Sequence, residues 1–329
     1  QYVIFELSYD EFHHNGDQIY RALFTDYQNG EKVGSSPRFG YGLGPALLED
    51  LPEVKTYVRT HGLGGDQAVI TSTERFGRTT QFHEEKVLFA DSTFLDVFTC
   101  DVSLGNGKFA LDNPSSIVLT QSTAKRYFGE GVNPIGKILR VFTQDWVKGD
   151  YEITAVIKDY PENSHLAFDF MIPIHNLLQI ENYKGSGANW NWVNFITYVE
   201  VHPNVAVEAM NAKTDALLTK YTGPNEPGSC IFTFQPLHEI HSADREDSAF
   251  SSIGLYVTIA LCILIIAWIN YVNISTAHAT ERAKEVGVKK AMGVFRTQLV
   301  GQFLVESLVI NFFSVILAVF MAMSSMPLL

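Results

Sequence analysis

The chain has 329 residues and a formal net charge of −12, with 46% apolar and 18% charged residues. This composition excludes a disordered chain and a chain buried wholly in a membrane, and the length indicates two units rather than one. The charge is uneven, because residues 1–250 have a net charge of −14 and residues 251–329 one of +2. An acidic region of this size is a poor partner for nucleic acid, so we expect none to bind.

A β-α-β sequence is predicted near the start of the chain. Residues 19–24 have the pattern of a strand that follows a turn, and residues 45–58 have the spacing of a helix. Pro52 lies inside the helical stretch and can break it. Residues 69–73 are expected to form the strand that closes this unit.

A second β-α-β sequence is predicted at 195–234, with strands at 195–201 and 230–234 around a helix that Asn204 can cap. Residues 82–173, between the two units, are richer in strands and turns. The elements expected there are strands at 116–120 and 151–157 and a helix at 121–128. We therefore predict an α+β extracytoplasmic domain over residues 1–247, built from two β-α-β units with an inserted strand-rich subdomain at about 82–173.

Histidines supply the most suggestive spacing for chemistry in this region. His238 and His241 are three residues apart and can share a metal ion if a third ligand arrives, but we favour a polar turn that leads towards a membrane. His13 and His14 are interpreted as a solvated helix face. No phosphate-binding loop, nucleophile elbow or CxxC pair occurs in the sequence. We therefore expect no catalytic residues, metal site or cofactor.

The aromatic and cysteine residues are interpreted as parts of a core. Trp190 and Trp192 can stack on a ligand, but aromatic residues just before a strand more often pack inside the domain. Cys100 and Cys230 are the only cysteines outside an apolar run, and no spacing motif supports a bridge between them. We expect buried free thiols, with a disulfide as the less favoured alternative.

Two uncharged stretches follow. Residues 253–272 are apolar and number the ~20 residues that a helix needs to cross a bilayer, and a second uncharged run covers 307–329. A helix buried in a soluble core is the alternative, but such helices are seldom so long and uniformly apolar. We predict membrane-spanning helices over residues 248–276 and 303–329.

The segment at 277–302 joins the two predicted spans and contains all five basic residues that follow position 250. Basic residues concentrate in cytoplasmic loops close to the ends of spans, so this segment is expected inside and the acidic domain outside. Small residues recur every four positions in it, at Ala279, Ala283, Gly287 and Ala291. A helix would place them on one face that another helix can approach closely. Docking to a cytoplasmic partner and anchoring to lipid headgroups both remain open.

Several segments together resemble ABC transporter permeases. Residues 269–277, 281–293 and 298–307 look like the signature of FtsX-like permeases. Residues 12–21, 116–129, 133–137 and 159–165 are similar to the MacB-like periplasmic core domain. The family's first and last spans would lie outside residues 1–329, so the resemblance suggests a chain truncated at both ends.

The resemblance implies a non-catalytic membrane subunit in the bacterial inner membrane, with its large domain in the periplasm. A cytoplasmic ABC ATPase subunit would push on the loop, and the spans would relay this motion to the periplasmic domain. The residues expected to couple to the ATPase are Arg282, Glu285, Gly287, Lys289, Lys290 and Gly293. Further expected partners are a second copy or a second permease half, and a periplasmic protein.

Two other functional classes are considered. A membrane-anchored extracytoplasmic sensor would bind a ligand outside and signal through its helices. Such a sensor normally continues into a long cytoplasmic output module, whereas here a second span follows the first after about 30 residues. A membrane-anchored hydrolase is weaker still, because no catalytic constellation is found.

Overall fold

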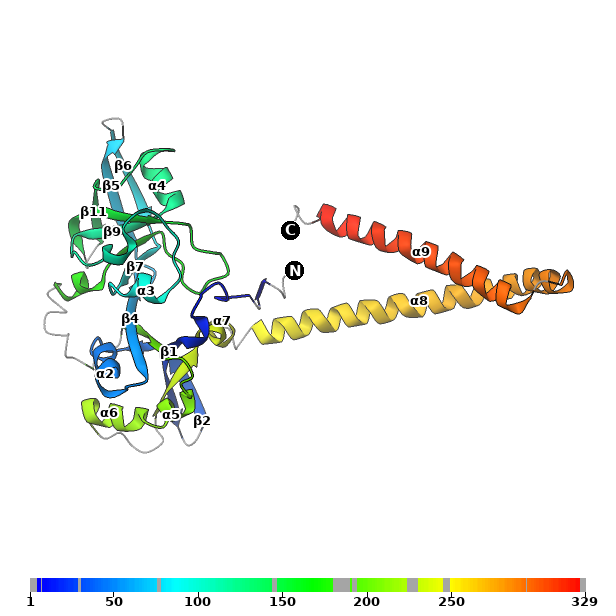
Figure 1. Ribbon diagram of the computed structural model, residues 1–329, viewed down its shortest axis with the longest axis horizontal. Coiled ribbons are helices and arrows are strands. Elements are labelled where there is room, and N and C mark those ends of the chain that lie inside the picture. Colours follow the sequence, from blue (N-terminus) through cyan, green and yellow to red (C-terminus); the bar gives the residue numbers. More distant parts are fainter. Residues whose placement is uncertain are drawn as a thin grey trace. The chain divides into compact units, whose positions relative to one another are not determined.

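The computed structural model describes residues 5–325 apart from 7, 29–30, 76–77, 144–146, 180–189, 191–193, 224–229, 245–248 and 294. The chain divides into two compact units, residues 1–250 and 251–329. We call them the α/β unit and the helical unit and describe each by itself (Figure 1).

Within the described residues, the strands of the α/β unit form one sheet in the order β14-β1-β13-β4-β7-β12-β9-β11-β10-β5-β6, with β2, β3 and β8 paired beside β1, β13 and β11. Their bounds are β1 Ile19–Gln28, β2 Glu31–Ser36, β3 Arg38–Phe39, β4 Val54–Gly62, β5 Ala68–Arg75, β6 Arg78–Glu84, β7 Val87–Ala90, β8 Val102–Gly105, β9 Ser116–Thr120, β10 Ile138–Thr143, β11 Lys148–Ile157, β12 Phe170–Pro173, β13 Phe195–Val201 and β14 Cys230–Pro236. The helices are α2 Leu43–Asp50, α3 Phe94–Val97, α4 Gln121–Phe128, α5 Val207–Asn211, α6 Thr214–Thr222 and α7 Ile240–Asp244, with short 3-10 turns at η1 Gly16–Gln18, η2 Gly107–Phe109, η3 Ile174–Gln179 and η6 Leu237–Glu239.

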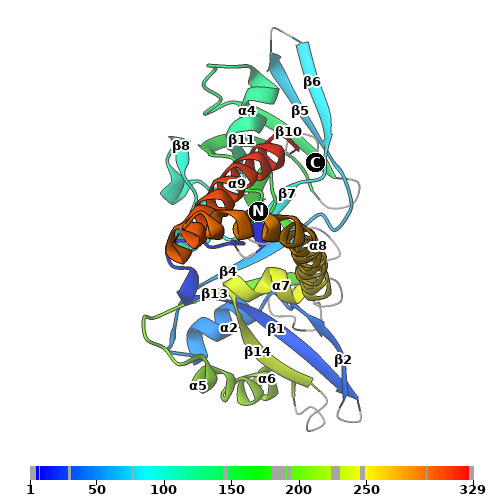
Figure 2. The same cartoon turned by 90° about the vertical axis from the view of Figure 1, so that its right-hand side faces the viewer.

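The two predicted β-α-β units interleave at one end of this sheet. In the order β14-β1-β13-β4 every neighbouring pair is antiparallel, so each unit is split by a strand of the other. Figures 1 and 2 show α2, α5 and α6 together at this end. Buried apolar residues of these helices and strands, such as Leu47, Leu217 and Phe232, form one core cluster.

The prediction of the first unit's closing strand is wrong. Helix α2 ends at Asp50, because Leu51 is already extended (φ −115°, ψ 99°) and Pro52 follows. Residues 54–62 then form β4, which closes the unit beside β13. The expected strand at 69–73 does exist as part of β5, but it pairs with β10 and β6 at the far edge of the sheet.

The inserted subdomain therefore begins earlier than residue 82 and contains β5 to β12. The predicted strand at 116–120 and helix at 121–128 are confirmed as β9 and α4, and the strand at 151–157 is part of β11. A second core cluster fills this region, with Phe89, Tyr127 and Phe170 completely buried. The α+β fold class and the inserted strand-rich region are both confirmed.

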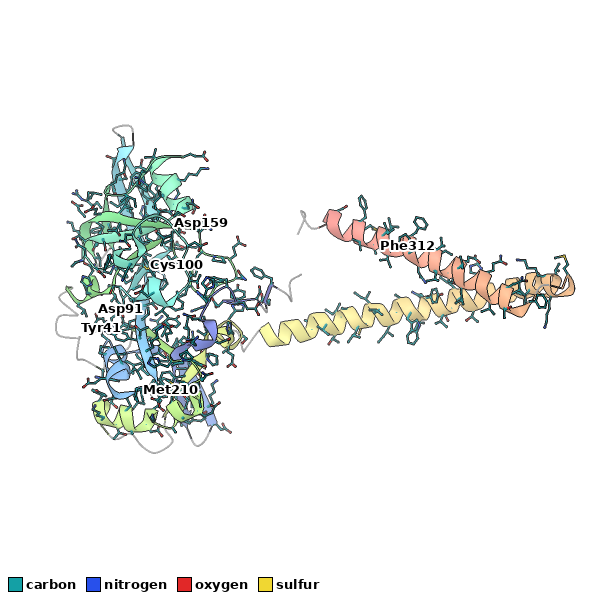
Figure 3. All side chains as sticks on the ribbon, in the orientation of Figure 1. Tyr41, Asp91, Cys100, Asp159, Met210 and Phe312 are labelled. Atoms are coloured by element: carbon teal, nitrogen blue, oxygen red, sulfur yellow. The ribbon has the colours of Figure 1, made fainter. Side chains whose placement is uncertain are left out.

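The helical unit contains α8 at Ala249–Ala291 and α9 at Arg296–Ser325. Candidate membrane spans lie at Val257–His278 and Thr297–Met321, by length and composition. Helix α8 continues well past the predicted span, so the segment at 277–302 is helical except for a short connection after Ala291. Alanine, glutamate and lysine, which are good helix formers, dominate residues 279–291, and the helix stops before Gly293, whose φ of +87° suits glycine. Figure 3 shows the side chains of α9, Phe312 among them, projecting from the ribbon.

Candidate functional site

The predicted coupling residues lie at the end of α8 that adjoins the connection to α9. Arg282, Glu285, Gly287, Lys289 and Lys290 are on α8, and Gly293 lies in the connection. A Cβ atom built on Gly287 would meet no other atom within 4 Å in the described part of the chain. The Lys289 ammonium donates to the Gln302 Oε1 of α9 at 3.4 Å, which links the two helices beside the connection.

Because α8 is unbroken here, its geometry places Ala279, Ala283, Gly287 and Ala291 along one side of the helix. A side lined by alanine and glycine lets another backbone approach closely. Basic residues flank this side in the sequence.

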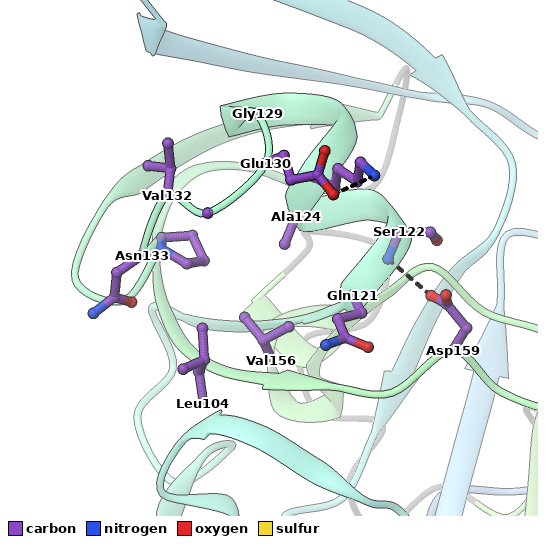
Figure 4. A pocket seen from close by; sticks show the side chains of 13 residues that line it. Leu104, Gln121, Ser122, Ala124, Gly129, Glu130, Val132, Asn133, Val156 and Asp159 are labelled. Atoms are coloured by element: carbon purple, nitrogen blue, oxygen red, sulfur yellow. Dashed lines mark hydrogen bonds and ion pairs between the residues drawn. The ribbon is translucent and has the colours of Figure 1, made fainter.

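A pocket of about 670 Å³ lies in the inserted subdomain, and sequence reasoning did not predict it (Figure 4). Leu104, Ala124, Val132 and Val156 contribute apolar lining. Its volume is in the range of small-molecule sites. The residues that line the pocket include members of three segments quoted for the family resemblance, at 116–129, 133–137 and 159–165.

Two polar contacts lie in the lining of this pocket. The Ser122 N–H at the start of α4 donates to Asp159 Oδ1 at 2.9 Å, and the Lys125 ammonium donates to Glu130 Oε1 at 3.0 Å (Figure 4). These contacts fix the helix and the loop after it.

The structure places the histidines of the two predicted pairs in different surroundings. His13 is buried and not on a solvated helix face, because it packs beneath Phe12 and against Phe98. His238 lies in the 3-10 turn η6, His241 lies in the short helix α7, and each faces its own carboxylate. The described residues contain no group of three or more His, Cys, Asp or Glu side chains that could hold a metal ion.

The aromatic and cysteine predictions are also tested. Trp190 stacks on Tyr221 with ring centroids 4.7 Å apart, which confirms a packing role, whereas Trp192 lies outside the described residues. Cys100 is a free thiol, so it forms no bridge with Cys230. Burial raises the pKa of Cys100 to about 12, which keeps the thiol protonated and unreactive.

Two family descriptions match the chain. The MacB-like periplasmic core domain matches residues 4–217, and the FtsX-like permease C-terminal region matches residues 257–329. The first match covers most of the α/β unit, and the second covers both candidate spans and the connection between them.

Individual relatives agree with this assignment. The chain is 24% identical over 212 residues to the macrolide export ATP-binding/permease protein MacB of Acinetobacter baylyi, a match that covers 64% of this chain and 30% of that protein. It is 24% identical over 261 residues to the ABC transporter permease YknZ of Bacillus subtilis, covering 76% and 60%. A domain of a permease protein from Porphyromonas gingivalis has the same fold, with a TM-score of 0.54 and 20% identity, covering 68% of this chain and 91% of that one.

The chain spans less than a third of the length of the export ATP-binding/permease relatives that it matches. The periplasmic core domain and the two apolar helices make it a membrane protein with an extracytoplasmic domain. The chain therefore belongs to the family with a MacB-like periplasmic core domain and an FtsX-like permease C-terminal region, the ABC transporter permeases of the MacB/FtsX type.

Proposed function

We propose that this chain couples ATP hydrolysis on a cytoplasmic ABC ATPase subunit to movement of its extracytoplasmic α/β unit, in the bacterial inner membrane. The observation that carries the proposal is the length of α8. Its candidate span ends at His278, but the helix continues without a break to Ala291. At 1.5 Å per residue this adds about 20 Å of helix beyond the span.

A continuous helix transmits force better than a flexible loop, because its backbone hydrogen bonds resist bending and stretching. A push on the part of α8 around Gly287 and Lys290 therefore passes directly into the first span. The contact between Lys289 and Gln302 lets the start of the second span follow. The net positive charge of residues 279–296 favours the cytoplasmic side for this end.

The names of the relatives support an ATPase partner, since MacB and SyfD are both described as ATP-binding/permease proteins. We propose that a separate ATPase subunit contacts Arg282, Glu285, Gly287, Lys289, Lys290 and Gly293. A second copy or a second permease half would complete the membrane part, and a periplasmic protein would bind outside. In this scheme the chain itself is non-catalytic and transmits motion.

Orientation is the first test. A reporter fused near Lys290 should be cytoplasmic, and one near Asn113 extracytoplasmic. Both reporters on one side of the membrane would contradict the proposal.

Coupling is the second test. The full chain is reconstituted in nanodiscs with the ABC ATPase that co-purifies with it, and ATP hydrolysis is compared for wild type and the double variant Lys289→Glu, Lys290→Glu. We expect a lower, salt-sensitive stimulation by the variant, because charge reversal weakens an exposed contact that salt also screens. If the variant and the wild type stimulate ATP hydrolysis equally, at low salt and at high salt, the result would favour lipid anchoring of this helix end.

A further inference from the structure

The segment formed by residues 5–18, here called the strap, contacts two separate parts of the α/β unit. On one side it meets the turn at 163–165, where the Asp10 N–H donates to the Asn163 carbonyl at 2.9 Å. On the other side it meets residues 237–241. Those residues belong to the short helical stretch that precedes α8 in the sequence. Leu237 and Ile240 in this stretch are themselves completely buried in the core. The strap adds polar contacts that join the same stretch to the turn at 163–165.

Asp10 fixes the strap to the core. Its side chain is completely buried and accepts hydrogen bonds from the Ser164 hydroxyl at 2.6 Å and from His165 Nδ1 at 2.7 Å. His165 Nε2 in turn lies 2.9 Å from the hydroxyl of Tyr198 on β13. A φ of +59° places the Asp10 backbone in the left-handed region, which Asp and Asn tolerate better than most residues. The chain adopts this geometry because the carboxylate must reach the turn.

His13 completes the surroundings of this carboxylate. Its Nδ1 accepts the Thr99 N–H at 3.1 Å, so the neutral ring carries its proton on Nε2, which lies 3.8 Å from Asp10 Oδ1. Burial alone would raise the pKa of Asp10, but the hydrogen bonds from His165 and Ser164 hold it below its ordinary value. The carboxylate is therefore ionised, and it is held by neighbours about 150 residues away in the sequence.

The other side of the strap is held by two acid–histidine pairs. Glu6 Oε2 lies 2.8 Å from His241 Nε2, and both side chains are largely buried. Asp17 Oδ1 lies 3.3 Å from His238 Nε2. The fit is close at Gly16, where an added Cβ would come within 2.8 Å of the His238 ring. The buried contact of Glu6 with His241 and the close fit of Gly16 against His238 thus join these residues to the strap, whereas Asp17 is exposed.

Neither a proton relay nor a metal site accounts for this cluster. An Asp-His-Tyr chain can relay protons in an enzyme, but Tyr198 is 1% exposed, so no substrate reaches its hydroxyl. A metal site needs three ligands at one point, and the described residues around Asp10, Glu6 and Asp17 supply no such group. The acid–histidine contacts instead lie in two sets, one on each side of the strap.

We propose that the strap is a second link between residues 237–244 and the core of the α/β unit, in addition to the buried side chains of Leu237 and Ile240, and that Asp10 is its positioning residue. This inference rests on the proposed function, because only a moving domain needs such a link. Without the strap, this segment would keep its link through β14 and the buried side chains of Leu237 and Ile240, but it would lose the polar contacts that Asp10 positions. With the strap in place, displacement of 237–244 is passed to the 163–165 turn and to β13.

The test is amide hydrogen exchange of the full chain in nanodiscs, for wild type, Asp10→Asn, Glu6→Gln and the double variant. Asn keeps the left-handed backbone preference, but it removes the charge and replaces one of the two acceptor oxygens with an amide donor. We expect Asp10→Asn to accelerate exchange about tenfold in the strap, which is the effect expected for loss of a hydrogen bond to a charged group. We expect a similar acceleration in residues 237–244, although Asp10 does not contact them. The double variant should be non-additive at 237–244, because both changes break one link.

Asp112→Asn is the matched control, since Asp112 is exposed in the same unit, and it should exchange as wild type. Unchanged exchange at 237–244 in Asp10→Asn, or additive effects in the double variant, would overturn the proposal and leave Asp10 a local packing residue. The assay contains no ATP, so its outcome is separate from the coupling experiment. If the reconstituted chain fails to respond to ATP hydrolysis while the strap result holds, the proposed function fails and the mechanical link stands.

Discussion

The α/β unit and the helical unit treat apolar side chains in opposite ways. Phe89 and Phe170 in the sheet are 0% exposed, whereas Leu264 on α8 and Phe312 on α9 are 68% and 64% exposed (Figure 3). The first unit has its own interior. The second presents apolar surface on all sides and needs lipid or other helices to cover it. The stability of the α/β unit is therefore encoded within the chain, whereas that of the helical unit depends on its surroundings.

The two units also differ in the burial of charged side chains, as Arg59 and Lys290 show. In the α/β unit, Arg59 is buried and donates to both carboxylate oxygens of Asp91 at 2.7 and 2.8 Å, with its guanidinium 3.6 Å from the centroid of the Tyr41 ring. In the helical unit the charged residues gather at 281–306 in the sequence, and Lys290 is exposed. Charge therefore supports the fold of one unit, and is available to partners in the other.

Truncating one phenylalanine in each unit should give the largest contrast. Phe89→Ala leaves a cavity in the core and should lower the free energy of unfolding of the α/β unit by about 3–5 kcal/mol. Phe312→Ala removes an exposed side chain and should leave that unfolding unchanged. Urea titration of the full chain in detergent, followed by tryptophan fluorescence, measures both. Equal effects would mean that the two units unfold as one.

Asp91→Ala tests the charged groups in the same way. It leaves the Arg59 guanidinium buried without its carboxylate, a change that costs about 3–5 kcal/mol for a buried pair. Asp150→Ala breaks an exposed pair with Arg140, whose two side chains are 51% and 68% exposed, and should leave the unfolding temperature almost unchanged. Thermal unfolding at neutral pH compares the two variants. Similar losses would show that the Arg59–Asp91 pair is not desolvated in solution.

Acid should weaken the α/β unit through His13. Burial lowers the pKa of His13 from 6.5 to about 4, so the unfolded chain takes up a proton near pH 6.5 and the folded chain only near pH 4. This contribution to stability is present above pH 6.5 and is lost as the pH falls towards 4, by up to about 3 kcal/mol. Asp10, whose pKa is lowered, loses its contribution only below its ordinary value of 3.8, outside that window.

His13→Asn separates this titration from packing. The Asn side-chain oxygen can still accept the Thr99 N–H but takes up no proton in this range. The variant should have a flatter dependence of melting temperature on pH between 6.5 and 4 than wild type. His83 is exposed and in the same unit, so His83→Asn serves as the control and should keep the wild-type slope. Parallel curves for the wild type and His13→Asn would contradict the assignment.

Local pattern was sufficient where a segment makes its own structure. The strand and helix at 116–128 are found where their pattern placed them, and the fold class follows from the alternation of such segments. Contacts between distant segments could not be predicted in this way. The residues next to Asp10 in the sequence do not indicate its contact with His165. Likewise, the residues around position 69 do not indicate that β4, and not β5, closes the first β-α-β unit.

At the candidate coupling end of α8, the sequence likewise predicted the local structure but not the contacts. Small-residue spacing in the sequence predicted one face of a helix, and α8 does extend through that stretch because good helix formers dominate it on both sides of Gly287. At Gly287 this face meets no neighbouring side chain within the described residues, so contacts within the chain do not identify its occupant. The pocket beside α4 was missed for a related reason, since its lining comes from segments that meet only in the folded unit.

The smallest expected change follows from placing a side chain on the open face of α8. The Cβ atom that Gly287→Leu adds meets no neighbouring side chain within 4 Å among the described residues, so expression and unfolding of the α/β unit should stay as in wild type. If an ATPase docks there, the branched side chain overpacks the contact at a cost of about 1–3 kcal/mol, and 1.4 kcal/mol is already tenfold in binding. ATP hydrolysis by the reconstituted complex, titrated with ATPase, measures this shift. Gly254→Leu, on the same helix and also without neighbours within 4 Å, is the matched control and should couple normally. Wild-type coupling by Gly287→Leu would show that the face is not a docking surface. Anchoring of this end of α8 to lipid headgroups would then be the favoured interpretation.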